Sequence, residues 1–509
     1  MCARSTSPNK IIIMPARYPL TDARLTIAAA IALVLASCND DVTTGNSEIK
    51  ADTEIQSQEL AQARDDDTRP NIVVVFTDDH GYADLGVQGV LGDVVTPHID
   101  QLAADGARMT AGYVTAPQCT PSRAGLITGR YQQRFGLDDN SFTPMPLSET
   151  TLAERLQDAG YATGMVGKWH LDIDENSQDF DNSTVTLNER TPYFPDQRGF
   201  ADVYTGFWKQ WWTNFDLQGN TVTVGSRPNE DYRLDVATDA GLTFIERHRQ
   251  EPFFLYLNYY APHVPLEAPD NYLSRFTNIS EIRRRYGLAM MSAVDDGVGK
   301  LREKLDSYQL SDNTLIFFIS DNGAPLGIHR LDLPIEDVSG EWDGSLNDPL
   351  IGEKGMLSDG GIRVPYIVSW PGTIPAGAVV DTAVSTLDVA STSLTAAGLE
   401  VPQELDGENL LPTLTEQSTE LEQRPLYWRF WSQSAIRKGT WKYLKAGSDH
   451  EFLFDMTTTG ETLNVLAEHP DVADELRAEL TQWSADLYRP GIPDESLTGP
   501  ELEWYQHYF

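Results

Sequence analysis

From Pro70 onward, short apolar runs alternate with longer segments in which apolar residues recur every three or four positions. The apolar runs are "NIVVVF", "ATGMVG", "FFLYLNY", "TLIFFIS" and "YIVSW", at 71–76, 162–167, 253–259, 314–320 and 366–370. Runs without polar alternation are typical of strands buried on both faces of a parallel sheet. The segments "TPHIDQLAADGA", "TTLAERLQDAG" and "LDVATDAGLTFIERHR" have the period of amphipathic helices. The pattern predicts an α/β fold, with helices on both faces of a central, mostly parallel sheet.

The pattern changes after about Arg424. The segments "RPLYWRFWSQSAIRKGTWKYLK" and "EFLFDM" predict short strands joined by tight turns, and a helix follows at about Pro470 to Leu487. We therefore expect a main domain over 70–423 and a C-terminal subdomain over 424–509, made of a small antiparallel sheet and a covering helix.

The first part of the chain is typical of an export signal. Arg17 and Arg24 precede the apolar run "LTIAAAIALVLAS", which is short for a membrane span. The small residues before Cys38 resemble the lipobox of bacterial lipoproteins, so we expect a signal peptide over 1–37 and a lipid anchor at Cys38; an ordinary signal peptide is the alternative. Residues 38–69 are acidic and polar and predict a flexible tether. The expected location is the periplasm or outer membrane of a bacterium, with membrane contact only through the anchor.

The negative net charge of the chain argues against nucleic acid as a partner. The 509 residues include 38 Lys and Arg against 76 Asp and Glu, a formal net charge of −38. Nucleic-acid binding needs a basic surface, so we expect none. An anionic substrate would need a local cluster of positive side chains.

Polar residues follow four of the five apolar runs. They would lie at the carboxyl ends of the strands, which is where open α/β sheets bind their ligands. Singly, each is ordinary turn or capping chemistry or a structural histidine; together at one edge they predict a site. The oxygen ligands suit a hard cation such as calcium or magnesium and are Asp78, Asp79, Asp321 and Asn322. The positive or proton-carrying groups are Lys168, His170, His263 and Lys354.

One cysteine stands apart. The chain has only Cys2, Cys38 and Cys119, and the first two lie in the export segment. In "CTPSRAGLITGR", Thr120 is the expected N-cap, Pro121 the first helical residue and Gly129 the end of the helix, with Arg123 in the first turn. A helix N-terminus favours anions. Because a hard metal is a poor partner for sulfur, the working group at Cys119 is expected to be based on oxygen.

These residues resemble a known family. "CTPSRAGLITGR" resembles the signature C-x-P-S-R-x-x-x-x-T-G-R of type I sulfatases, in the alkaline-phosphatase-like superfamily, whose cysteine a separate maturation enzyme oxidises to Cα-formylglycine. From about Pro70 to the C-terminus the family order is followed by "NIVVVFTDDHGYADLG", "VGKWHL", "APHVPL", "SDNG", "GEKG", "GGIRVPYIVSWPG" and "FLFDMTTTGETLN". The resemblance implies an alkaline-phosphatase-like fold and hydrolysis of a sulfuric ester.

The resemblance also implies roles for the site residues. It implies one calcium ion, bound by the modified Cys119 with Asp78, Asp79, Asp321 and Asn322. The hydrated aldehyde would attack sulfur, while Arg123 and Lys168 steady the diol and the sulfate. His263 and Lys354 would protonate the departing alcohol, and His170 would take a proton to expel sulfate.

The substrate is less constrained. Ile351, Glu353 and Asp359 depart from the pattern of many relatives at positions expected near the substrate mouth, below an acidic loop at 324–348. The aromatic stretch "GFWKQWWTNFD" offers a sugar platform of Trp208, Trp211 and Trp212, although core packing explains them equally well. Together with the predicted export signal and the acidic composition, the aromatic stretch favours as substrate a sulfated polysaccharide or its oligosaccharides, such as the marine galactan carrageenan. The alternatives are a phosphodiesterase or phosphonate monoester hydrolase of the same superfamily, and a glycan-binding protein whose cysteine stays unmodified.

Overall fold

A computed structural model describes residues 68–140, 143–173, 186–336, 342–415, 418, 421 and 423–509. The expected signal peptide over 1–37 and nearly all of the tether over 38–69 lie outside these residues. Within them, no helix combines the length and the apolar composition needed to cross a bilayer.

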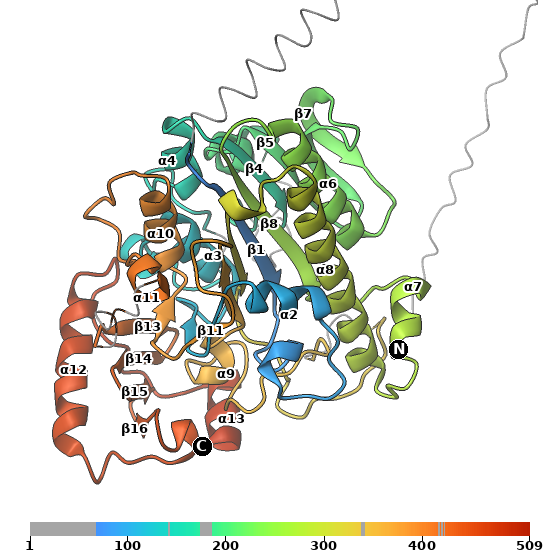
Figure 1. The fold of residues 1–509 in the computed structure, drawn as a ribbon. Helices are drawn as coiled ribbons and strands as arrows, with labels where there is room; N and C mark the ends of the chain where they lie inside the picture. Colours follow the sequence, from blue (N-terminus) through green and yellow to red (C-terminus); the bar gives the residue numbers. More distant parts are fainter. Residues whose placement is uncertain are drawn as a thin grey trace, which may run out of the picture. The chain divides into compact units, whose positions relative to one another are not determined.

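A ten-stranded sheet forms the centre, in the order β11-β2-β10-β9-β1-β8-β4-β5-β6-β7. Its strands are β1 (Asn71–Asp78), β2 (Ala107–Met109), β4 (Ala162–Gly167), β5 (Asp202–Phe207), β6 (Gln210–Phe215), β7 (Thr221–Pro228), β8 (Phe253–Pro262), β9 (Thr314–Ser320), β10 (Tyr366–Ser369) and β11 (Ala378–Val380). Strands β1, β8 and β4 lie in the middle of Figure 1. The neighbours β9, β1, β8, β4 and β5 run parallel. The predicted mostly parallel sheet is confirmed.

The last of the five predicted strands runs the other way. β10 pairs antiparallel with β9, whereas the apolar run predicted a parallel strand. The physical reason is the path of the chain: the N–H of Gly323, just after β9, donates to the carbonyl of Gly361, just before β10, at 3.0 Å. The chain is therefore still at the carboxyl edge of the sheet when β10 begins, and it can only run back.

Helices cover both faces of this sheet, as predicted. Ile72, Val74 and Phe76 of β1 share an apolar core with α3 (Cys119–Thr128), α4 (Leu152–Asp158) and α10 (Asp388–Ala396). The alternate residues Val73 and Val75 pack on the other face with α2 (Pro97–Ala104), α6 (Arg233–His248) and α8 (Ile282–Ser307). The sequence patterns above do not predict α8, which contains Gly287, Gly297 and Gly299. These glycines weaken the helical pattern, but a Cβ at Gly299 would lie 2.7 Å from the His98 ring on α2.

The C-terminal part contains the predicted antiparallel sheet and helix. The sheet is β13 (Leu426–Phe430), β14 (Gln433–Lys438), β15 (Trp441–Ala446) and β16 (His450–Asp455), in that order. It packs against α12 (Pro470–Ala485) through an apolar cluster that also includes Tyr131 and Leu387. A further helix, α13 (Gly499–Tyr508), was not predicted. The boundary at 423/424 stays a prediction. The remaining elements are β3 (Gly112–Tyr113), α5 (Leu187–Arg190), α7 (Asp270–Leu273), α9 (Asp359–Ile362), β12 (Val384–Ser385) and α11 (Leu411–Thr415).

Buried ion pairs join this C-terminal sheet to the start of α9. The Lys442 ammonium, fully buried on β15, lies 2.8 Å from Asp359 Oδ1 and 2.7 Å from Glu461 Oε1. Asp359 also accepts from the Tyr113 hydroxyl at 3.2 Å and faces Arg363 at 3.3 Å. Burial raises the pKa of Glu461 to about 7, despite the nearby ammonium. Asp359, expected near the substrate mouth, instead points into this cluster between the two sheets.

Candidate active site

Four strand ends meet at one edge of the central sheet. Asp78 ends β1, Asp321 follows β9, Lys168 follows β4, and His263 follows β8. These four strands are parallel neighbours in the sheet. Parallel neighbours present their carboxyl ends at the same edge. The structure therefore brings together residues that lie up to 243 positions apart in the sequence.

The carboxylates form one buried group. Asp78, Asp79, Cys119 and Asp321 each offer a ligand atom, and these atoms all lie within 4.8 Å of one another. Asp79 has a φ of 60°, a left-handed conformation that Asp tolerates better than most residues. Its N–H donates to Asp321 Oδ1 at 3.1 Å. The Asn322 amide donates to Asp79 Oδ1 at 2.6 Å.

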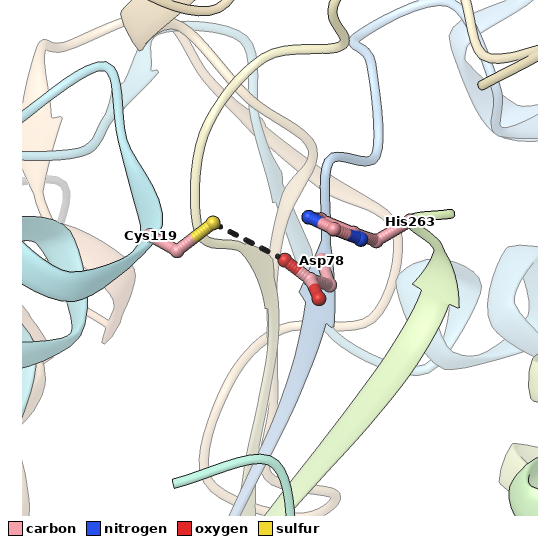
Figure 2. A group of neighbouring side chains, drawn as sticks. All are labelled: Asp78, Cys119 and His263. Atoms are coloured by element: carbon pink, nitrogen blue, oxygen red, sulfur yellow. Dashed lines mark hydrogen bonds between the residues drawn. The ribbon is translucent and has the colours of Figure 1, made fainter. Parts of the chain in front are cut away.

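Cys119 lies at the first residue of α3, with its Sγ 3.4 Å from Asp78 Oδ1 (Figure 2). The expected cap is wrong: the N-cap position is Gln118, and Thr120 is inside the helix. The reason is a contact from outside the motif, because Asn140 Oδ1 accepts the Thr120 N–H at 2.9 Å. Gly129 ends the helix with a φ of 68°, as predicted.

Three cations surround the carboxylates. Arg123 donates through Nε and Nη2 to Asp321 Oδ2 at 3.0 and 2.7 Å. The Lys168 ammonium lies 2.9 and 2.7 Å from the two oxygens of Asp78. The Lys354 ammonium lies 2.6 Å from Asp79 Oδ1 and 3.5 Å from Cys119 Sγ. This is the local positive cluster that an anionic substrate needs in so acidic a chain.

Burial and charge act in opposite directions on the pKa values here. Burial raises the pKa of Asp78, but Lys168, His263 and Arg123 outweigh it and hold that pKa well below its usual value. Burial raises the pKa of Asp321 to about 6 even beside Arg123. Burial, with Asp321, also raises the pKa of the Cys119 thiol. The unmodified thiol is therefore neutral at pH 7, which is a poor state for a sulfur nucleophile.

The two histidines differ in position. Figure 2 shows the His263 ring beside Asp78. His263 Nε2 lies 3.7 Å from Asp79 Oδ2, and its Nδ1 lies 2.5 Å from the Val264 carbonyl oxygen. Burial lowers the His263 pKa, so the ring is neutral near pH 7. His170 lies two residues after Lys168, half-buried and with a φ of 56°. In the described part of the chain, it belongs to neither group of ligand atoms around Asp78.

The three tryptophans do not share one surface. Trp211 and Trp212 are consecutive residues of β6, so their side chains point to opposite faces. Trp211 is 1% exposed and packs in the core with Tyr204, their ring centroids 5.3 Å apart. Trp212 donates to Asp196 Oδ1 at 2.9 Å, and Trp208 is 40% exposed in the turn before β6. The three tryptophans therefore cannot form one sugar-binding platform. For Trp211, the alternative explanation, packing in the core, is correct.

Two further buried carboxylates lie near the site, of which Asp343 was not predicted from the sequence. Asp343 is 1% exposed, and its Oδ2 has no hydrogen-bond partner within the described ranges. Burial, with Asp79 nearby, raises its pKa well above the usual value. Glu353, expected near the substrate mouth, is buried and accepts from the N–H groups of residues 326, 327 and 328 at 2.8, 2.7 and 3.0 Å. It also accepts from the Tyr508 hydroxyl of α13 at 3.1 Å.

The residues present fit a hard divalent cation. Asn322 Oδ1 is buried and has no hydrogen-bond partner in the part of the chain that the structure describes. It lies beside Asp79, in a group of buried carboxylate oxygens. An amide oxygen buried without a partner costs free energy unless something binds it. A cation with oxygen ligands removes that cost and offsets the repulsion among the carboxylates.

Known proteins share this sequence and fold. Residues 70–399 match the family described as Sulfatase, and residues 351–484 match N-sulphoglucosamine sulphohydrolase, C-terminal. The N-acetylgalactosamine-6-sulfatase of Mus musculus is 33% identical over 436 residues, which cover 79% of each chain. The crystal structure of Ps i-CgsB in complex with k-i-k-neocarrahexaose has 31% identity and a TM-score of 0.71, covering 86% of this chain and 97% of that chain. A phosphonate monoester hydrolase from Silicibacter pomeroyi, 19% identical with a TM-score of 0.62, shares the fold.

The fold, with cations and buried carboxylates gathered at the carboxyl edge of its parallel strands, places the protein in the alkaline-phosphatase-like class. Within that class, the chain belongs to the sulfatase family. It is an enzyme, a sulfuric ester hydrolase. The roles of the individual site residues stay predictions.

Proposed function

We propose that this sulfatase removes sulfate from a sulfated carbohydrate, with Cys119 converted to Cα-formylglycine and one calcium ion bound beside it. The observation that carries the proposal is the placement of Cys119. Its Sγ lies 3.4 Å from Asp78 Oδ1 and 3.5 Å from the Lys354 ammonium. A nucleophile there would face both the oxygen ligands of a cation and the positive charge that holds a sulfate.

The calcium ion would be bound by the modified Cys119 together with Asp78, Asp79, Asp321 and Asn322. When bound, the cation neutralises sulfate charge as a Lewis acid, and the hydrated aldehyde supplies the attacking oxygen. Arg123 and Lys168 orient the sulfate and the side chain at position 119 through charge-assisted hydrogen bonds.

Proton transfer is assigned to the remaining groups. His263 Nε2 and the Lys354 ammonium both lie beside Asp79, and we assign them to protonation of the departing alcohol. Lys354 is positively charged at neutral pH, since Asp79 and its other anionic neighbours raise its pKa despite burial. His170 would accept the proton released when sulfate leaves.

The proposed substrate is a marine galactan such as carrageenan, or its oligosaccharides. Support comes from two similar proteins: Ps i-CgsB, solved in complex with k-i-k-neocarrahexaose, and an N-acetylgalactosamine-6-sulfatase. Desulfation of a panel of defined sulfated oligosaccharides, followed by mass spectrometry of the products, tests this choice. If only glycosaminoglycan fragments lose sulfate, carrageenan is refuted as the substrate, but the proposal of a sulfated carbohydrate substrate stands.

The cysteine chemistry has its own experiment. Mass spectrometry of the tryptic peptide that contains Cys119 should show an aldehyde in active protein, and Cys119→Ala should abolish turnover of an aryl sulfate. An intact thiol in active protein would refute the formylglycine. Faster turnover of an aryl phosphodiester than of an aryl sulfate would favour the phosphonate monoester hydrolase alternative, and binding of glycans without any turnover would favour the non-catalytic one.

We also propose export to the periplasm or outer membrane, with a lipid anchor at Cys38 and a formylglycine-generating enzyme as partner. The support is the sequence "LTIAAAIALVLASC" and the sulfatase signature at Cys119. Labelling of cells with a palmitate analogue should mark the wild-type protein and not the Cys38→Ser variant. Export without label would indicate an ordinary signal peptide.

A further inference from the structure

Two tryptophans from the C-terminal part lie face to face at its surface. Trp431 is in the turn between β13 and β14, and Trp504 is on α13. Their ring centroids are 6.3 Å apart, with planes inclined by 10°. Trp431 is 43% exposed and has a φ of 46°. A bulky residue rarely adopts this left-handed conformation, and such residues concentrate at functional sites.

Trp504 lies directly beside the candidate active site. It covers Gly355, where an added Cβ would lie 2.4 Å from its ring. Gly355 follows Lys354, whose ammonium is 3.5 Å from Cys119 Sγ. The N–H of Gly355 donates to the carbonyl of Pro117, two residues before Cys119, at 3.0 Å.

Trp431 is linked to the same region through the loop that contains Asp139 and Asn140. Its indole N–H donates to Asp139 Oδ2 at 3.3 Å. The next residue, Asn140, accepts the N–H of Thr120 at the start of α3. The paired indoles are therefore connected to the segment 117–120 through Gly355 on one path and through Asp139 and Asn140 on the other. The side chain of Lys354, the residue before Gly355, is 17% exposed.

We propose that Trp431 and Trp504 bind a pyranose ring of the carbohydrate substrate, in the residue next to the one that carries the sulfate. The inference rests on the proposed carbohydrate substrate. The C–H face of a sugar ring packs on an indole, and an aromatic side chain with a polar edge suits such a ligand. Exposure of Trp431 leaves its ring accessible, while its bond to Asp139 and its contact with Phe430, at a centroid distance of 4.6 Å, fix its orientation.

The experiment compares a saccharide with a small substrate on the full-length, formylglycine-containing enzyme. The saccharide is a defined carrageenan hexasaccharide, or the oligosaccharide of the panel that the wild type desulfates fastest; the small substrate is an aryl sulfate. Trp431→Ala should raise the KM for the saccharide roughly fivefold to tenfold with little change in kcat, which is the scale of one aromatic contact. Trp431→Phe should restore most of the loss.

Two controls separate binding from folding. The kinetics of the aryl sulfate, which lacks the neighbouring sugar residue that Trp431 is proposed to bind, should stay within about twofold of wild type in Trp431→Ala. Trp441→Ala removes an indole at the first residue of β15, which pairs with Lys438 at the end of β14 remote from Trp431, and should leave the kinetics of both substrates unchanged. An unchanged saccharide KM in Trp431→Ala overturns the inference, as does an equal loss on both substrates. A wild type that hydrolyses aryl sulfate but no saccharide overturns the proposed substrate instead.

Discussion

Lys442 should be the most costly cation to remove from the C-terminal sheet. Its ammonium is fully buried and pairs with Asp359 at 2.8 Å and with Glu461 at 2.7 Å. Lys442→Met keeps most of the unbranched side chain, removes the charge and leaves both carboxylates buried, at 2% and 5% exposure. Loss of one partner of a buried ion pair costs about 3 to 5 kcal/mol. Arg363 still faces Asp359 at 3.3 Å, so the uncompensated charge falls mainly on Glu461.

Because the uncompensated charge lies on Glu461, the free energy of unfolding lost in Lys442→Met depends on pH. Burial raises the pKa of Glu461 to about 7 with the ammonium present, and removal of Lys442 raises it further. A carboxyl whose pKa is higher in the folded state than in the unfolded state binds more protons when folded, so stability falls as pH rises through that interval. The loss in Lys442→Met should therefore be smaller at pH 6, where Glu461 is protonated, than at pH 8.

Urea denaturation followed by tryptophan fluorescence measures the free energy of unfolding at both pH values. Lys438→Met is the matched control, because Lys438 is on the adjacent strand and its pair with Glu479 is partly exposed, at 28% and 30% of the two side chains. It should cost no more than about 1 kcal/mol. Equal losses in the two variants, or a larger loss for Lys442→Met at pH 6 than at pH 8, would refute the reasoning.

Three further predictions concern the site and its surroundings. Lys354→Met should lower kcat/KM for an aryl sulfate by about 10²-fold to 10³-fold, the usual effect of losing one stabilising group, with mass spectrometry showing position 119 still converted; an activity near wild type would exclude a role for Lys354. Chelation of calcium should lower the midpoint of thermal unfolding, and added calcium at about 100 times its Kd should restore about 2.7 kcal/mol; a midpoint indifferent to calcium would count against the proposed cation. Burial lowers the pKa of His248, but its bonds to Asp202 and Glu251 outweigh this and raise it. The stability that His248 contributes should therefore be full below about pH 6.5 and decline above it. His248→Gln should remove this pH dependence from the free energy of unfolding measured with urea, and a pH dependence that persists would contradict the assignment.

The strand ends could be predicted from the sequence because burial and pairing are encoded locally. Runs such as 71–76 and 314–320 are too apolar for a surface strand, and polar residues directly after them have to lie at one edge if the strands are parallel. Asp78 and Asp321 were found in this way, although their roles stay predictions. The same local rule failed at β10, because strand direction depends on where the preceding loop leaves the chain.

Other features depend on contacts between distant segments and left no local pattern. Thr120 has the chemistry of an N-cap, but Asn140 binds its N–H from 20 residues away. Whether Trp211 or Trp212 faces the core depends on how β6 pairs with β5, not on composition. Asp343 is buried because Arg283 and Arg284 of α8 bind the carbonyls on either side of it. The sequence did not predict α8, since its glycines weaken the helical pattern.

The burial of Cys119 has a consequence for the order of events in biosynthesis. Its side chain is 1% exposed at the first turn of α3, enclosed by Asp78 and by the segment that carries Lys354. A second protein cannot reach a side chain so enclosed without opening the sheet edge around it. Oxidation by a separate enzyme, as proposed, therefore has to precede folding, while residues 119–130 are still an extended peptide. Once the domain has closed, a cysteine that escaped oxidation lies out of reach of that enzyme.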